Sequence, residues 1–162
     1  MFYRIAEQIA ELPFSVWVST STWIWPTMEI LHFVGLSLLL GSLLIIDLRM
    51  AGYLSAIQAS LIERLLPWTL VGFGMNLVTG VLFFVGDPTR YIVNVGFQIK
   101  ILLILIAGLN AIFYYWRVRS TIGAWDPDVA PPLIARTIAY VSISTWTAVL
   151  LLGRLIPYVG TG

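Results

Sequence analysis

Cysteine is missing from this chain, histidine occurs once, and charged residues are scarce. The missing thiols exclude disulfides, haem attached through a CxxCH motif, thiolate-ligated clusters and cysteine nucleophiles. Charged side chains account for 10% of the 162 residues, whereas a soluble domain carries about 25%. With a formal charge of +1 the chain has no basic field for nucleic acid, so no nucleic-acid partner is expected.

The familiar motifs of enzymes are absent as well. The sequence has no HExxH, no nucleophile elbow, no phosphate loop and no GxGxxG. Hydrolytic catalysis therefore has no visible machinery, and the chain is not expected to be an enzyme on its own.

Apolar residues, in contrast, are abundant. They make up 59% of the chain, and the mean hydropathy of +0.92 does not fit a surface that faces water. A helix needs about 20 apolar residues to cross a bilayer, and four such runs occupy residues 26–46, 65–85, 95–116 and 138–159. Short connections make successive helices antiparallel neighbours. The sequence therefore predicts an all-α integral membrane protein, a four-helix up-and-down bundle that forms a single domain over residues 1–162.

Residues 1–25 precede the first span and differ from it in pattern. Between residues 2 and 12, apolar and polar side chains occupy opposite faces of a helix, and Pro13 ends that pattern. The residues that follow place Trp17, Trp23 and Trp25 among serines and threonines, a composition typical of headgroup depth. We expect residues 1–25 to lie in the membrane interface and to begin with an amphipathic N-terminal helix.

The cations near the span ends predict the orientation. The loops after the first and third spans carry five arginines: Arg49, Arg64, Arg117, Arg119 and Arg136. The opposite side has fewer cations outside the spans, with two more just inside them: Arg4, Arg90, Lys100 and Arg154. Because an excess of Lys and Arg marks cytoplasmic loops, we expect a multi-pass protein of the bacterial inner membrane with both termini outward.

The single histidine, His32, lies in the first span, three residues after Glu29. Ionisable groups at membrane depth are costly unless they face a bundle interior, a partner or a cofactor. In the predicted topology Lys100 and Arg154 fall at the same depth, within a slab of about 10 Å. We expect Glu29 and His32 to point inward, and at least one of them to contact Lys100, Arg154 or a ligand. No comparable polar group is expected in the cytoplasmic half of the spans.

Small and polar stripes predict which faces of the later spans look inward. The stripe of the second span consists of Gly72, Asn76, Thr79 and Gly80. That of the fourth consists of Tyr140, Ser144, Thr147 and Arg154. Such stripes are the usual packing faces of membrane helices, and packing is the simplest explanation of both. We expect the amide of Asn76, which lies mid-span, to hydrogen-bond to another helix.

One use of the outward polar group is haem binding. His32 has the chemistry of an axial ligand of haem b, and Lys100 and Arg154 would then pair with the propionates. The second axial ligand would come from Met28, Met75, a second copy of the chain or a partner subunit. Met28 is one turn from His32 on the same helix, so these two cannot ligate opposite haem faces.

Three other uses stay open. Copper could be bound by Met28, Glu29 and His32, but three potential ligands within five residues often occur by chance, so copper ranks below haem. A quinone site would use Glu29 and His32 for protons and the apolar interior for the ring. A structural clamp would pair Glu29 and His32 with Lys100 or Arg154.

Several runs of residues carry a resemblance to a known family: residues 25–35 (WPTMEILHFVG), 47–52 (DLRMAG), 79–84 (TGVLFF), 97–100 (FQIK) and 109–111 (LNA). In these the chain resembles small bacterial four-helix inner-membrane proteins without an assigned activity. It is also distantly similar to the membrane domain of copper-resistance D proteins. The resemblance covers the first three spans and implies the architecture and a shared His32 and Lys100. The lack of further histidines and of a Met-rich tract argues against copper transport.

These observations predict a small membrane subunit that binds a haem, a metal or a quinone beside a redox partner. The expected partners are the lipid bilayer and either another membrane protein or further copies of the chain. A non-catalytic structural or assembly subunit is one alternative. A copper or small-solute permease is another, although four spans without an evident inverted repeat fit it less well.

Overall fold

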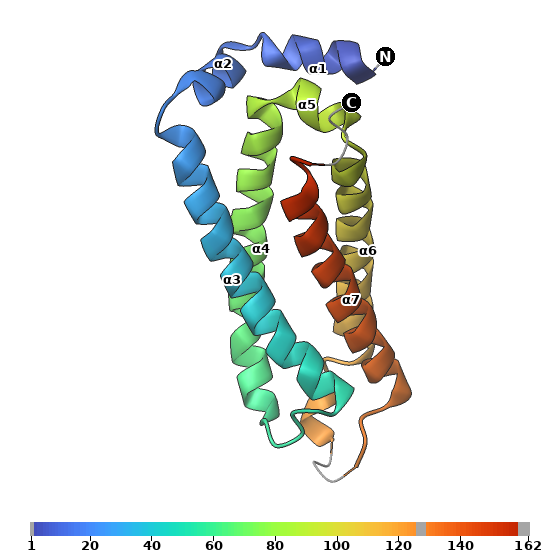
Figure 1. The fold of residues 1–162 in the computed structure, drawn as a ribbon. Coiled ribbons are helices and arrows are strands. Elements are labelled where there is room, and N and C mark those ends of the chain that lie inside the picture. Colours follow the sequence, from blue (N-terminus) through green and yellow to red (C-terminus); the bar gives the residue numbers. More distant parts are fainter. Residues whose placement is uncertain (1, 126–128, 159–162) are drawn as a thin grey trace.

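The computed structural model describes residues 2–125 and 129–158, and within these ranges the chain is built from helices (Figure 1). The short ones are α1 (Phe2–Ala10), α2 (Pro13–Thr20), α5 (Pro88–Val93) and the 3-10 turn η1 (Ile122–Ala124). The long ones are α3 (Ile24–Ala51), α4 (Ala59–Gly86), α6 (Val95–Arg117) and α7 (Leu133–Leu155). The order alternates up and down, as the sequence predicts.

The four long helices are long and apolar enough to cross a membrane. Their outer faces carry large apolar side chains, such as Phe33, Leu70 and Leu105, each more than 60% exposed. In water such a surface would be unfavourable, whereas in a bilayer it meets lipid chains. The chain is therefore a multi-pass helical membrane protein, and the predicted fold class is confirmed.

The long helices of the bundle pack against one another in pairs. Helix α3 packs against both α4 and α7, and α6 packs against α7. At one end of the bundle, which we call the capped end, α1 and α2 lie across the helix ends, α1 against α5 and α2 against α4 and α3 (Figure 1). The opposite end, the loop end, holds the connections from α3 to α4 and from α6 to α7 (Figure 1). A hydrogen bond of 2.6 Å from the Ser15 hydroxyl to the carbonyl of Val85 fixes α2 to the end of α4.

The helix ends differ from several of the predicted span limits. Helix α3 continues past residue 46 to Ala51, and α7 runs from Leu133 to Leu155, so it begins and ends earlier than the predicted 138–159. Helix α3 ends where Gly52 adopts a left-handed conformation with φ of 96°, which suits glycine. Proline 132 immediately precedes α7. Backbone geometry, and not the first charged residue, thus sets these ends, so Asp47 and Arg49 belong to α3.

Two glycines set the contact between α3 and α4. A Cβ atom on Gly72 would lie 2.5 Å from the backbone nitrogen of Leu39 and 2.7 Å from the carbonyl oxygen of Gly35. A Cβ atom on Gly35 would lie 2.6 Å from the side-chain nitrogen of Asn76. The two backbones therefore approach as closely as glycine permits, a common arrangement of membrane helices.

The prediction for Asn76 is confirmed in part. It lies at this α3–α4 contact, as expected. Its side-chain nitrogen, however, donates to the carbonyl of Gly72 at 2.8 Å, one turn back on its own helix. The expected bond to another helix is formed instead by Asn110, which donates to the carbonyl of Ile138 at 3.0 Å and joins α6 to α7.

The inward face of α7 differs from the prediction. The buried side chains of this helix are Ala135, Ile138, Ala139, Ser142, Thr145 and Val149. The stripe that was expected inside is exposed: Tyr140, Ser144, Thr147 and Arg154. The small side chains Ala135 and Ala139 allow α7 to approach its neighbours closely, and this outweighs the polar stripe.

Candidate functional site

His32 is half-buried on α3, and its ring is held by α4. The Nδ1 atom of His32 lies 2.7 Å from the hydroxyl oxygen of Thr79, which is itself buried. The edge of the His32 ring faces Phe83 with ring centroids 5.6 Å apart. A hydrogen bond and an aromatic contact from the same helix thus fix the orientation of the imidazole.

The bonding of Thr79 assigns the tautomer of His32. The Thr79 hydroxyl also lies 2.7 Å from the carbonyl oxygen of Met75, which can only accept. The single hydroxyl proton therefore goes to Met75, and the Thr79 oxygen accepts from Nδ1–H of His32. This leaves the lone pair of Nε2 available, and that atom forms no hydrogen bond within residues 2–125 and 129–158.

Lys100 enters the same region from α6. Its side chain is half-buried and reaches α7 at Gly153, where a Cβ atom would lie 3.4 Å from the ammonium nitrogen. The positive charge of Lys100 acts electrostatically on His32, without a hydrogen bond between the two side chains among the described residues. Among the described residues, Lys100 has no hydrogen-bond partner and no acidic partner. Within the described part of the chain, this ammonium group thus has no protein anion beside it.

Glu29 does not share this enclosed position. Its side chain is exposed, and its carboxylate accepts a hydrogen bond of 3.2 Å from the Trp25 indole on its own helix. It also lies within electrostatic reach of Tyr91 on α5, whose pKa is raised above its usual value mainly by burial. The expectation that Glu29 points into the bundle is therefore wrong. The reason is geometric, because three residues turn a helix by about 300° and leave Glu29 beside, not above, His32.

Arg154 also lies outside the group. Its side chain is exposed, and its guanidinium carbon lies 5.9 Å from the centre of the Tyr158 ring. This position follows from the rotation of α7, which turns Thr145 and Val149 inward instead. Of the four predicted binding residues, His32 and Lys100 are half-buried and interact electrostatically, whereas Glu29 and Arg154 are exposed.

The residues proposed for a metal are not gathered on one face. Met28 is buried while Glu29 is exposed, although both are near His32 in sequence. Met75 lies on α4, and its side chain packs at Gly35, one turn of α3 from His32. The described residues contain no group of three or more His, Cys, Asp or Glu side chains that could hold a metal ion.

A second polar group lies in the loop-end half of the bundle, where none was expected. Asp47 and Arg49 are only 2% and 4% exposed. The Nε atom of Arg49 donates to the carbonyl of Ile57 at 2.9 Å, and its guanidinium lies 5.9 Å from the Trp125 ring. The hydroxyl group of Ser142 on α7 lies near the Asp47 carboxyl group. The prediction that this half lacks such a group is wrong, because α3 continues past both residues.

A sequence signal for Asp47 did exist. It continues, at spacings of four and seven residues, the helical face that carries Leu43 and Leu40. Treating Asp47 as the end of the span hid this periodicity.

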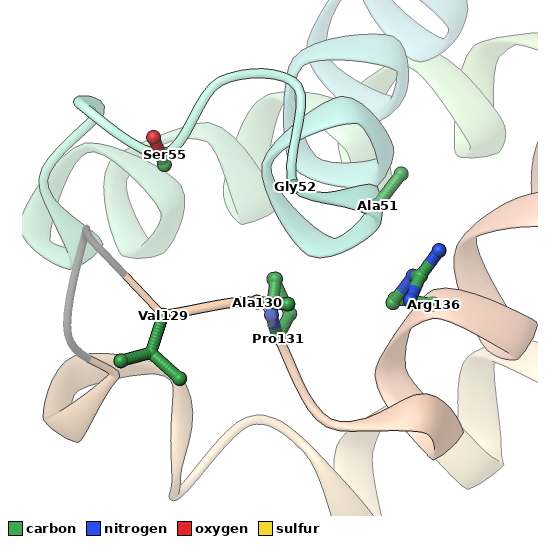
Figure 2. A pocket seen from close by; sticks show the side chains of 7 residues that line it. All are labelled: Ala51, Gly52, Ser55, Val129, Ala130, Pro131 and Arg136. Atoms are coloured by element: carbon green, nitrogen blue, oxygen red, sulfur yellow. The ribbon is translucent and has the colours of Figure 1, made fainter.

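A hollow at the loop end has a volume of about 250 Å³. Figure 2 shows it between the end of α3 and the segment that leads into α7. Its lining is Ala51, Gly52, Ser55, Val129, Ala130, Pro131 and Arg136. Arg136 is the one charged side chain among these, and the hollow contains no candidate for chemistry.

Comparison with known proteins gave no match: no family model, no curated protein and no solved structure matched this chain. The likeness to copper-resistance D membrane domains therefore stays a prediction, and any function has to be argued from the geometry.

Proposed function

We propose that this protein is a membrane subunit that binds the head of a lipid-soluble quinone between His32 and Lys100, beside a redox partner. The observation that carries the proposal is the half-buried ammonium of Lys100, which has no acidic partner among residues 2–125 and 129–158. Such a group is costly in an apolar interior unless a ligand or water accepts its protons. A quinone carbonyl is an acceptor of this kind and reaches the site from the bilayer.

The fixed tautomer of His32 supports the same proposal. With Nδ1–H bound to Thr79, the Nε2 lone pair can accept the proton of a quinol hydroxyl. Lys100 would donate to an oxygen of the ring. When bound, a quinone supplies two-electron, two-proton transfer to the partner, and the chain supplies the hydrogen bonds and the proton acceptor. The rings of Phe83 and Trp25, 5.3 Å apart, line the capped-end side of His32.

A haem remains compatible with His32, because a hydrogen bond at Nδ1 is the usual support for a ligating Nε2. The propionate partners argue against it. Arg154, one of the two cations it requires, is exposed and faces Tyr158. A quinone needs only Lys100 of these two cations, so it fits the chain better than a haem does.

The competing class is a structural or assembly subunit. The observation that favours it is the bond between His32 and Thr79, which joins α3 to α4 whether or not a ligand binds. In this alternative the group only clamps the helices, and Lys100 reaches water at the capped end.

Purified protein in nanodiscs separates these possibilities. A short-tailed benzoquinone is titrated while tryptophan fluorescence is followed, because Trp25 lies close to the site through Phe83. We expect saturable quenching that weakens about tenfold in Lys100→Met. The matched control is Arg154→Met, which removes an exposed cation from the same end and should leave the affinity unchanged.

Each alternative has its own outcome. A Soret band in the visible spectrum of the protein would show that the site binds a haem and not a quinone. Absence of saturable quenching together with a featureless spectrum would leave the structural clamp. Equal weakening by Lys100→Met and Arg154→Met would mean that surface charge, and not the site, attracts the probe.

A further inference from the structure

A crevice separate from the His32 site lies between α3 and α7. Its volume is about 160 Å³. The lining is largely apolar: Leu40, Leu43, Leu44, Asp47, Ile143, Trp146, Thr147 and Leu150. Because α3 and α7 run antiparallel, the crevice extends from Asp47 near the loop end towards Leu40 and Leu150 nearer the middle, a distance of about 10 Å along the helix.

Asp47 is the acidic side chain among the residues that line this crevice, and no cation of the described residues forms an ion pair with it. Its nearest basic neighbour in the sequence, Arg49, is engaged by the Ile57 carbonyl and by the Trp125 ring. Ser142 lies near the Asp47 carboxyl group but carries no charge. In the part of the chain that the structure describes, the single ion pair is Asp87 with Arg90, far away at the capped end. A carboxyl group at membrane depth without a cation is the kind of group that marks a binding site.

We propose that this crevice binds the head of a lipophilic ammonium ion, with Asp47 as its counter-ion and the apolar chain of the ligand between α3 and α7. Charge complementarity selects a cation. The Trp146 ring, held edge-on against Phe73 at 6.3 Å, forms an aromatic wall, which attracts ammonium groups. The leucines on both helices suit an alkyl chain.

The size of the crevice limits the ligand further. Sites for whole drug-sized molecules measure about 300–1,000 Å³, so this crevice holds a head group and the first part of a chain. The rest of the ligand stays in the bilayer. The bound class is thus an alkylammonium amphiphile that enters sideways from lipid, and the proposal is independent of the His32 site.

Photolabelling tests the proposal directly. The probe is dodecyltrimethylammonium with a diazirine near the head, added below its micellar concentration to the protein in phosphatidylcholine nanodiscs. We expect saturable labelling of a peptide that contains residues 143–150. Unlabelled dodecyltrimethylammonium should compete, whereas dodecanol and dodecyl sulfate should not, because they lack the positive head.

Substitutions test whether the labelling depends on Asp47 and on this crevice. Asp47→Asn should lower labelling at least about tenfold, since it removes the buried counter-ion. Glu63→Gln is the matched control, because it removes an exposed acidic group from the loop end of α4 and should label normally. If Asp47→Asn fails to fold, Thr147→Phe provides the test, since it fills the crevice from an exposed position of α7 and should abolish labelling.

Two kinds of result would contradict the ammonium-binding proposal. Competition by dodecanol as strong as by the cation would show a merely apolar groove and overturn the proposal. Unchanged labelling in folded Asp47→Asn, or in Thr147→Phe, would do the same.

Discussion

The Nδ1 atom of His32 and the hydroxyl oxygen of Thr79 are 2.7 Å apart and connect two helices that are also in contact through Gly35 and Gly72. The close approach of the two backbones brings the side chains within bonding distance. The bond in turn fixes the ring that the quinone proposal requires. Helix packing and the proposed quinone site therefore depend on the same interface.

The first prediction concerns the energy of this bond. The single variants His32→Ala and Thr79→Val and the double variant should show a coupling of about 1 kcal/mol in the free energy of unfolding, as for other polar bonds between membrane helices. Denaturant unfolding in detergent measures it. Ser37→Ala serves as the control, because its hydroxyl bonds within α3 and is exposed. Additive effects of the two substitutions would mean that the bond does not stabilise the fold.

The second prediction concerns the glycine contact. Gly72→Ala should destabilise the protein by about 1–3 kcal/mol, because the added methyl group meets the backbone of α3, which cannot move aside locally. Gly74→Ala is the matched control on the same helix, since no atom lies within 4 Å of a Cβ atom there. Thermal unfolding of both variants provides the comparison. A loss of stability in Gly74→Ala as large as in Gly72→Ala would refute the packing argument.

The third prediction compares two half-buried asparagines of the spans, Asn76 and Asn110. Asn110→Leu should cost about 1 kcal/mol of stability, because it removes a bond between α6 and α7. Asn76→Leu should cost less, since its amide bonds within α4 and its side-chain oxygen has no hydrogen-bond partner. The free energies of unfolding of both variants give the order. The reverse order would show that Asn76 stabilises the α3–α4 contact.

The fourth prediction concerns orientation. Reporter fusions after Gly52 and after Asp126 should stay in the cytoplasm, because the loop end holds the excess of arginine. Export of either reporter would place the capped end, and His32 with it, on the cytoplasmic side.

The fold could be predicted because bilayer thickness limits it so strongly. Four apolar runs of the required length leave few alternatives to four helices that alternate in direction. The ends of the helices were harder to predict from the sequence. Arg136 looks like a loop residue because it is charged, yet α7 begins three residues earlier, at Leu133. A long charged side chain near a helix end can reach outward, so it does not mark where the helix begins.

The faces of the helices were harder to predict than their existence. In lipid the hydrophobic effect does not decide which side of a helix is buried, so small steric differences do. In α7 the small residues Ala135 and Ala139 are buried, and the polar stripe that was expected to face inward is exposed. Arg154 belongs to that stripe and therefore lies outside the site. His32 kept its inward position because Thr79 was available as a partner on α4.

The bond between Ser15 and Val85 joins residues that are 70 positions apart in the chain. During synthesis the hydroxyl is made long before the carbonyl that accepts from it, and α1 rests on α5, which is made later still. Helices α1 and α2 can therefore dock on the capped end only after the first two spans have been made.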